Sequence, residues 1–161
     1  MYNVKLTIVF ILFSIGVLAQ LPKDSELFLS LKKQDSIFFE RSFNQCDSLY
    51  TIKSITDRLM FYHDQGGIQN KKIFLDNTKK YLCADPLKKP IRKLVEGTLE
   101  AYPLYNNGTL YGAIQHGVHD FFIREPEKED VKTSTAKFTS VWLLDNGQWK
   151  LDCVLSYDHQ P

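Results

Sequence analysis

Two Asn-Gly pairs constrain the fold of this chain more than any other feature of its sequence. They are Asn107-Gly108 and Asn146-Gly147. Asn-Gly is the strongest short-range signal for a two-residue hairpin, because both residues adopt positive φ at little cost. The pairs separate four strand-like segments, which are residues 91–105, 110–123, 136–145 and 148–159. The second half of the chain is therefore predicted to form four long antiparallel strands.

The first half of the chain follows helical patterns around a single strand-like segment, residues 57–64. Residues 24–52 predict a helix that begins at Asp24 or Ser25 and a second, short helix capped by Asp47, and residues 70–83 predict a helix capped by Asn70. We expect the following side chains to face inward: Leu27, Leu31, Ile37, Phe38, Phe43, Ile73, Phe74 and Tyr81. Helices followed by strands in this order predict an α+β domain, with the N-terminal helices packed on a curved antiparallel sheet.

The N-terminus resembles a signal peptide over residues 1–19. Lys5 precedes an apolar run from Leu6 to Leu18, which is shorter than the roughly 20 residues of a membrane-spanning helix. Val17 and Ala19 provide the small side chains of a cleavage site, so we expect export to the periplasm or secretion, with an uncleaved anchor as the alternative. Residues 20–161 would then form a single domain without membrane attachment.

Charge and cysteine content restrict the possible partners and bridges. Lys and Arg number 20 against 19 Asp and Glu, without a basic cluster, so nucleic acid is not an expected partner. Three cysteines in an exported chain allow one disulfide and a free thiol, or three free thiols. If a bridge forms, Cys46 with Cys83 is favoured, because Cys153 lies in the apolar pattern of a predicted central strand.

Five segments together carry a resemblance to a known family. They read "FYHDQGG", "LVEGTLEAYPL", "AIQHGVHDFF", "FTSVWLLDNGQWKL" and "LSYDHQ". In this order they resemble the nuclear transport factor 2-like superfamily, which includes SnoaL-like and ketosteroid isomerase-like proteins, and within it an exported bacterial branch known as domain of unknown function 4440. The resemblance implies a cystatin-like cone with a pocket between sheet and helices. It implies no particular reaction, because one fold hosts many functions.

Strand alternation predicts which polar side chains reach this pocket, since residues two apart share a face. In the last strand, Trp149, Leu151, Cys153 and Leu155 define an apolar face that continues to Tyr157 and His159. His63 is favoured as inward-facing near the end of residues 57–64. His119 and Gln115 are expected to face the cavity, with His116 on the opposite face. Tyr62 and Trp142 are further candidate ligand contacts, although Trp142 also fits a core aromatic.

The candidate chemistry is that of histidine beside a carboxylate. His63 with Asp64, and His159, could act as general base or acid, because a carboxylate fixes the tautomer of an imidazole and raises its basicity. The alternative is that these histidines only form structural hydrogen bonds at the strand ends. Arg92 and Glu96 fit a surface ion pair, and the alternative is that Glu96 lies at the edge of the pocket.

Metal and cofactor sites have little support in the sequence. His63, His119, His159 and Asp64 would suffice in number for a metal, but no local ligand spacing supports one, so no metal is predicted. No P-loop, nucleophile elbow or Gly-rich dinucleotide turn is present, and no cofactor is expected.

Three functions are compatible with these features. The first is binding of a small apolar ligand in a pocket lined by His, Tyr and Asp. The second is a cofactor-independent isomerase, dehydratase or cyclase that uses a His–Asp pair. The third is a homodimeric assembly module, which could coexist with either of the others.

Overall fold

The structure is a computed structural model that describes residues 20–161. The predicted signal peptide, residues 1–19, lies outside the described residues. Among the helices of residues 20–161, none is long and apolar enough to cross a membrane.

Helices occupy the N-terminal part of the chain, and two of them end in a π-helical turn. The helical elements are α1 (Glu26–Phe39), η1 (Glu40–Asn44), α2 (Ser48–Ser54), α3 (Lys71–Asn77) and η2 (Thr78–Leu82). The strands are β1 (Ile55–His63), β2 (Gly67–Asn70), β3 (Lys89–Leu94), β4 (Glu100–Asn106), β5 (Thr109–Arg124), β6 (Val131–Asp145) and β7 (Gln148–Gln160).

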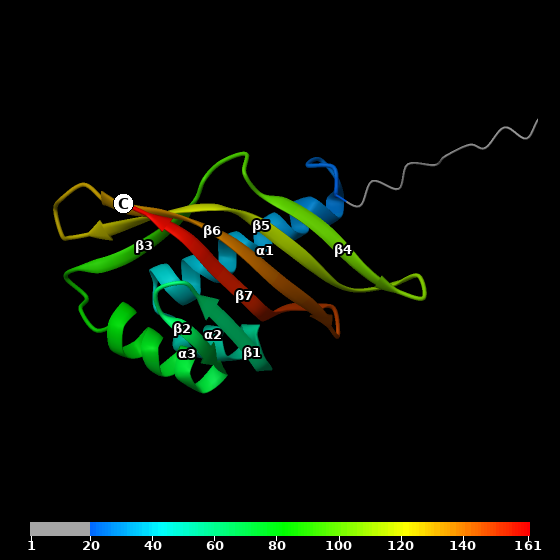
Figure 1. Ribbon diagram of the computed structural model, residues 1–161, viewed down its shortest axis with the longest axis horizontal. Coiled ribbons are helices and arrows are strands. Elements are labelled where there is room, and N and C mark those ends of the chain that lie inside the picture. Colours follow the sequence, from blue (N-terminus) through cyan, green and yellow to red (C-terminus); the bar gives the residue numbers. More distant parts are fainter. Residues whose placement is uncertain (1–19) are drawn as a thin grey trace, which may run out of the picture.

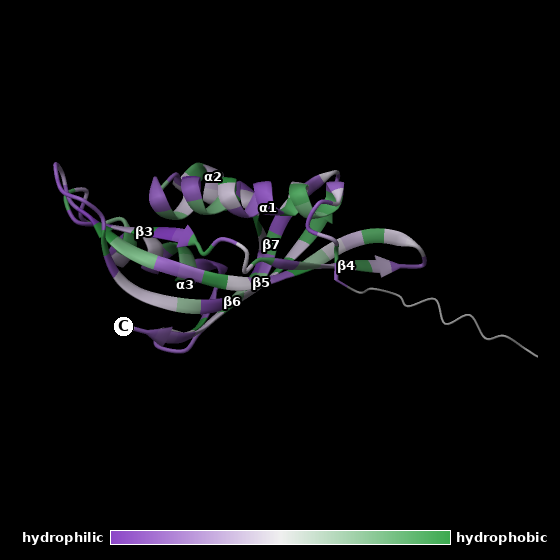
Figure 2. Ribbon diagram, turned by 90° about the horizontal axis from the view of Figure 1, so that it is seen from above, coloured by the Kyte–Doolittle hydropathy of each residue, from purple (hydrophilic) through white to green (hydrophobic). Residues whose placement is uncertain are grey.

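All seven strands form one sheet in the order β2-β1-β7-β6-β5-β3, and β4 pairs with β5 beside β3. Only the β1–β7 pair is parallel, and it brings the end of β1 next to the end of the chain (Figure 1). Figure 2 shows α1 and α2 lying across one face of the curved sheet. The predicted α+β class, with N-terminal helices on a curved and mostly antiparallel sheet, is confirmed.

The predicted helix caps and hairpin turns are present. Ser25, rather than Asp24, caps α1, and Asp47 and Asn70 accept hydrogen bonds from the first turns of α2 and α3. Asn107-Gly108 and Asn146-Gly147 all have positive φ, as a two-residue turn between twisted strands requires. Local chemistry thus determines where most of the elements begin and end.

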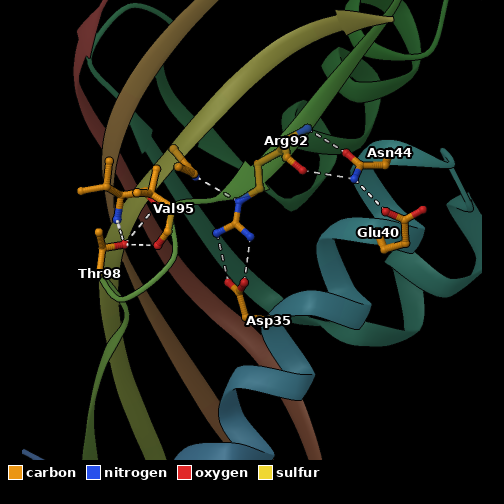
Figure 3. Close-up of polar contacts among 8 residues, drawn as sticks. Asp35, Glu40, Asn44, Arg92, Val95 and Thr98 are labelled. Carbon is orange, nitrogen blue, oxygen red and sulfur yellow. Dashed lines mark hydrogen bonds and ion pairs between the residues drawn. The ribbon is translucent and has the colours of Figure 1, made fainter. Parts of the chain in front are cut away.

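The segment 91–105 contains two strands where the sequence pattern predicted one. Val95–Leu99 leaves the sheet between β3 and β4, with Gly97 at φ +79°, and both strands pair with β5. The Thr98 hydroxyl donates to the Val95 carbonyl at 2.7 Å and accepts from the Val118 amide at 3.1 Å, which closes the bend (Figure 3). The bend places β3 beside the helices. The short strand β2 was also not predicted.

The buried face of α1 differs in part from the predicted stripe. Leu31 and Phe38 are buried as expected, but Phe28 and the acidic Asp35 complete the face, while Ile37 is exposed. In α3, Ile73 is likewise exposed. An aspartate on the apolar side of a helix requires a partner inside the molecule.

The predicted face of β7 is wrong between Cys153 and Tyr157. Asp152 forms a bulge, since Leu151 and Cys153 pair with the consecutive residues Trp142 and Val141. The bulge reverses the alternation, so that Val154 and Ser156 are buried and Leu155 and Tyr157 are exposed. A second irregularity at Asp158, whose φ is +59°, reverses it again and returns His159 to the inner face.

A disulfide joins Cys46 and Cys83, as favoured from the sequence, and Cys153 is free. The bridge links the residues that follow η1 and η2, two helical turns that are far apart in the chain. It closes a loop over a sequence separation of 37. Such a cross-link stabilises the folded state mainly by restricting the unfolded chain.

We expect the double variant Cys46→Ser/Cys83→Ser to lose about 3–4 kcal/mol of unfolding free energy, because the unfolded chain regains the freedom of that loop. Denaturation in urea without a reductant measures the difference. Cys153→Ser is the matched control and should change stability by less than about 1 kcal/mol. Equal stability of the double variant and the oxidised wild type would contradict the prediction.

Candidate functional site

A cavity of about 710 Å³ lies between the inner face of the sheet and the helices. Every helical element and every strand except β4 contributes to its walls. Seven phenylalanines line it, which are Phe38, Phe39, Phe43, Phe61, Phe74, Phe121 and Phe138. Three of the four histidines, His63, His119 and His159, also belong to its wall. A volume of this size with apolar walls and a few polar groups is typical of small-molecule sites.

His159 and Asp64 form a hydrogen-bonded pair at one side of the cavity. The parallel pairing of β1 and β7 brings them together, and the ladder continues past β1 through the Asp64 amide and the Ser156 carbonyl. His159 Nδ1 lies 2.6 Å from Asp64 Oδ1, and its backbone amide donates to Oδ2 at 3.2 Å. Partial burial opposes ionisation of Asp64, but these two hydrogen bonds outweigh it and lower the pKa of the carboxyl. Because a carboxylate only accepts, the proton between the two groups is on Nδ1, and Nε2 lies 3.4 Å from the Ser156 hydroxyl.

His63 stacks on His159 but has a different hydrogen-bonding state. The two ring centroids are 4.5 Å apart. His63 Nδ1 accepts the backbone amides of Gln65 and Gly66 at 3.1 and 3.0 Å, so its proton is on Nε2. Burial and the neighbouring His159 lower the pKa of His63. His63 therefore remains neutral and does not donate to Asp64, although Nδ1 and Oδ1 are 3.4 Å apart.

His119 is held from behind by a buried ion pair. Arg92 donates to both carboxylate oxygens of Asp35, at 2.7 and 3.2 Å, and its Nε donates to His119 Nδ1 at 3.2 Å. Asp35, Arg92 and His119 are 0%, 4% and 4% exposed. Burial, reinforced by the charge of Arg92, lowers the pKa of His119 to about 2. This histidine is neutral at all physiological pH values.

The environment of Arg92 explains why it can be buried. The guanidinium lies 3.8 Å from the ring centroid of Phe39, a cation–π geometry. The backbone amide and carbonyl of Arg92 both form hydrogen bonds with the side-chain amide of Asn44 (Figure 3). The Asn44 amide nitrogen also donates to the carboxylate of Glu40. Arg92 thus fastens α1 and η1 to the edge strand β3. The predicted surface pair of Arg92 with Glu96 is wrong.

Sequence reasoning missed the Asp35–Arg92 pair, although a signal was present. Asp35 lies four residues after Leu31 and three before Phe38, which is within the apolar stripe of α1. A carboxylate at such a position indicates a buried cation. The sequence does not indicate which of the basic residues is its partner.

Of the other predicted ligand contacts, none lines the cavity. Tyr62 and Tyr157 are about 40% exposed on the outer face of the sheet; the bulge in β7 accounts for Tyr157. Gln115 faces inward as expected, but it and Trp142 are fully buried and do not line the cavity. His116 lies on the outer face, 3.1 Å from Glu100. The structure thus brings together His63, Asp64 and His159, with His119 in the same cavity wall.

The group His63, Asp64 and His159 offers metal-ligand atoms within 4.8 Å of one another, and His119 is not among them. A metal on Nδ1 of His63 would face two backbone N–H groups that already use its lone pair. The arrangement therefore fits a hydrogen-bonded network better than a metal centre.

A search of the sequence against known families and against curated proteins found no match. Solved structures, in contrast, match over most of the chain. The chain has the nuclear transport factor 2-like fold, also described as cystatin-like. This likeness is one of fold, because all the identities are low, and membership of the domain of unknown function 4440 branch stays a prediction.

Three of the matching structures illustrate the likeness. A nuclear transport factor 2-like superfamily protein from Salmonella enterica serovar Typhimurium LT2 is 14% identical, with a TM-score of 0.58 over 80% of this chain and 92% of its own. A protein of unknown function of this type from Shewanella oneidensis MR-1 is 17% identical, with a TM-score of 0.56 over 81% of this chain and 98% of its own. A protein of unknown function with a cystatin-like fold from Nostoc punctiforme PCC 73102 is 14% identical, with a TM-score of 0.59 over 85% of this chain and 94% of its own.

Stability should fall on mild acidification because of His119. The unfolded chain protonates this histidine near its ordinary pKa of about 6.5, whereas the folded chain keeps it neutral down to a pKa of about 2. The contribution of the neutral His119 to the free energy of unfolding is complete above pH 6.5 and decreases by about 1.4 kcal/mol for each pH unit below that value. When the pH is lowered from 7 to 5, the free energy of unfolding of His119→Gln should therefore fall by about 2 kcal/mol less than that of the wild type, as measured by urea denaturation. His116→Gln is the control, and parallel curves for wild type and His119→Gln would refute the prediction.

Proposed function

We propose that this protein binds a small, predominantly apolar molecule inside its cone. The cavity of about 710 Å³, walled by seven phenylalanines, carries the proposal. Burial of an apolar ligand there would gain roughly 25 cal/mol for each Å² removed from water. The three histidines in the wall supply the few polar contacts that orient such a ligand.

Binding is tested with Nile red, an uncharged apolar dye whose fluorescence rises in an apolar site. The dye should bind to the wild type, and Asn77→Trp should weaken binding at least about tenfold, because a half-buried indole at the cavity wall occupies its space. Lys79→Trp adds the same indole at an exposed position outside the cavity and should bind like the wild type. Equal binding by both variants would place the dye elsewhere.

The Asp64–His159 pair favours a second, compatible function, which is cofactor-independent acid–base catalysis of the isomerase, dehydratase or cyclase kind. Asp64 keeps the Nδ1 proton in place, and Nε2 of His159, which lies 3.4 Å from the Ser156 hydroxyl, can accept a proton from a molecule in the cavity. His63, stacked against the ring, limits its rotation. Such a pair contributes typically 10²–10⁴-fold to a proton transfer.

The base is tested by proton exchange into a ketone. In D₂O, the wild type should accelerate the uptake of deuterium into the methyl group of 2-acetylnaphthalene, followed by mass spectrometry. His159→Asn should reduce the accelerated rate at least about 100-fold, because asparagine can still donate to Asp64 but offers no base. His116→Asn, on the outer face, is the control. Undiminished exchange in His159→Asn would exclude His159 as the base.

Export and self-association complete the proposal. The Cys46–Cys83 disulfide supports an oxidising compartment such as the periplasm or the extracellular medium. The exposed side chains of Tyr62, Leu155 and Tyr157 on the outer sheet face support a homodimer through that face.

A further inference from the structure

We infer that His119 is a hydrogen-bond donor of fixed tautomer, and that the ligand presents a neutral carbonyl oxygen to it. The inference rests on the proposed binding in the cavity and adds the chemical class of the ligand. It also makes Asp35 and Arg92 positioning residues for this contact.

The tautomer follows from the neighbour on the other side of the ring. The nitrogens of the Arg92 guanidinium only donate, so His119 Nδ1 can only accept. Arg92 cannot turn away, because its two terminal nitrogens both bind Asp35. Phe39 and Phe138 lie 3.8 and 5.0 Å from the guanidinium carbon. The proton of the neutral ring is therefore on Nε2.

This Nε2–H group has no partner among the described residues. His119 lines the main cavity and Arg92 does not. Nε2 itself has almost no accessible surface, so a ligand oxygen reaches it only when the side chains around it move slightly aside. The ring is fixed between Phe121 and Phe138, with centroid distances of 4.6 and 5.0 Å. A buried donor without an acceptor costs about 1–3 kcal/mol, which a ligand oxygen would recover.

The charge around His119 selects a neutral acceptor. Asp35 compensates the charge of Arg92, and His119 itself is uncharged, so this wall offers a hydrogen bond without a net charge. A carboxylate ligand would lose its hydration without gaining an ion pair, and an ammonium group, which only donates, would meet another donor. A carbonyl oxygen on an apolar body satisfies both the donor and the phenylalanine walls.

The test compares 2-acetylnaphthalene with 2-isopropenylnaphthalene, which replaces the carbonyl oxygen by a CH₂ of similar size. Displacement of Nile red from the wild type should show the ketone binding about 2- to 10-fold more tightly, and 2-naphthoate more weakly than the ketone. His119→Leu should remove the preference for the ketone, and His119→Gln, which keeps an N–H donor, should retain it.

A second measurement reads the tautomer directly by ¹⁵N NMR of the histidine side chains. In the wild type, His119 should carry its proton on Nε2 and should not titrate between pH 5 and 8. In Asp35→Leu/Arg92→Met, which removes the ion pair without leaving a buried charge, His119 should populate both tautomers. An Nδ1–H tautomer in the wild type, or unchanged spectra in the double variant, would overturn the inference.

The outcomes separate this inference from the proposed function. If the dye binds but the ketone and the alkene displace it equally, or neither displaces it, the donor role of His119 is refuted and ligand binding stands. If the dye itself does not bind in the cavity, the proposed function fails, and the inferred ligand class fails with it.

Discussion

The buried ion pair between Asp35 and Arg92 determines how the helices sit on the sheet. It joins the middle of α1 to the edge strand β3, and the guanidinium extends the connection to His119 on β5. A buried ion pair contributes little stability relative to apolar side chains of similar size, because both charges lose their hydration. Its effect here is one of position: the carboxylate and the arginine fork fix a distance and an angle that packed hydrocarbon would leave adjustable. The position of His119 in the cavity wall depends on this geometry, because Arg92 donates to its ring.

The fold follows from short-range signals that the sequence displays openly. Asn107-Gly108, Asn146-Gly147 and the cap residues Ser25, Asp47 and Asn70 act through their immediate neighbours, so their effect is visible without the tertiary structure. The division of residues 91–105 into β3 and β4 was not visible, because it depends on Thr98 bonding to β5, twenty residues away.

The site was accessible from the sequence only in part. His63 and His159 were expected at the ends of their strands, and the parallel β1–β7 pairing places them together with Asp64. The ligand contacts predicted at Tyr62, Tyr157, Gln115 and Trp142 are absent from the cavity wall. For Tyr157 the reason is a bulge, which no alternation rule anticipates. Arg92 was missed because the partner of a buried carboxylate lies 57 residues further along the chain.

The disulfide and the two π-helical turns concern the helical wall of the cavity. Residues of η1 and η2 line it, and Cys46 and Cys83 lie two residues and one residue after these turns. π-Helical turns are often found at functional sites, where the extra residue per turn redirects side chains. The covalent link holds the ends of the two turns close together.

The two irregularities of β7 together decide on which face of the sheet His159 lies. Each of them, at Asp152 and at Asp158, exchanges the inner and outer faces of the strand, and the second exchange restores what the first one inverted. Strict alternation from Leu151 places His159 on the inner face, and it does lie there. Most of the residues from 152 to 158 lie on the face opposite to the one that alternation predicts. Any one-residue insertion or deletion between the two positions would leave Trp142 covered by Leu151 and yet turn the imidazole away from the cavity. The direction in which His159 points thus depends on the number of residues in this strand.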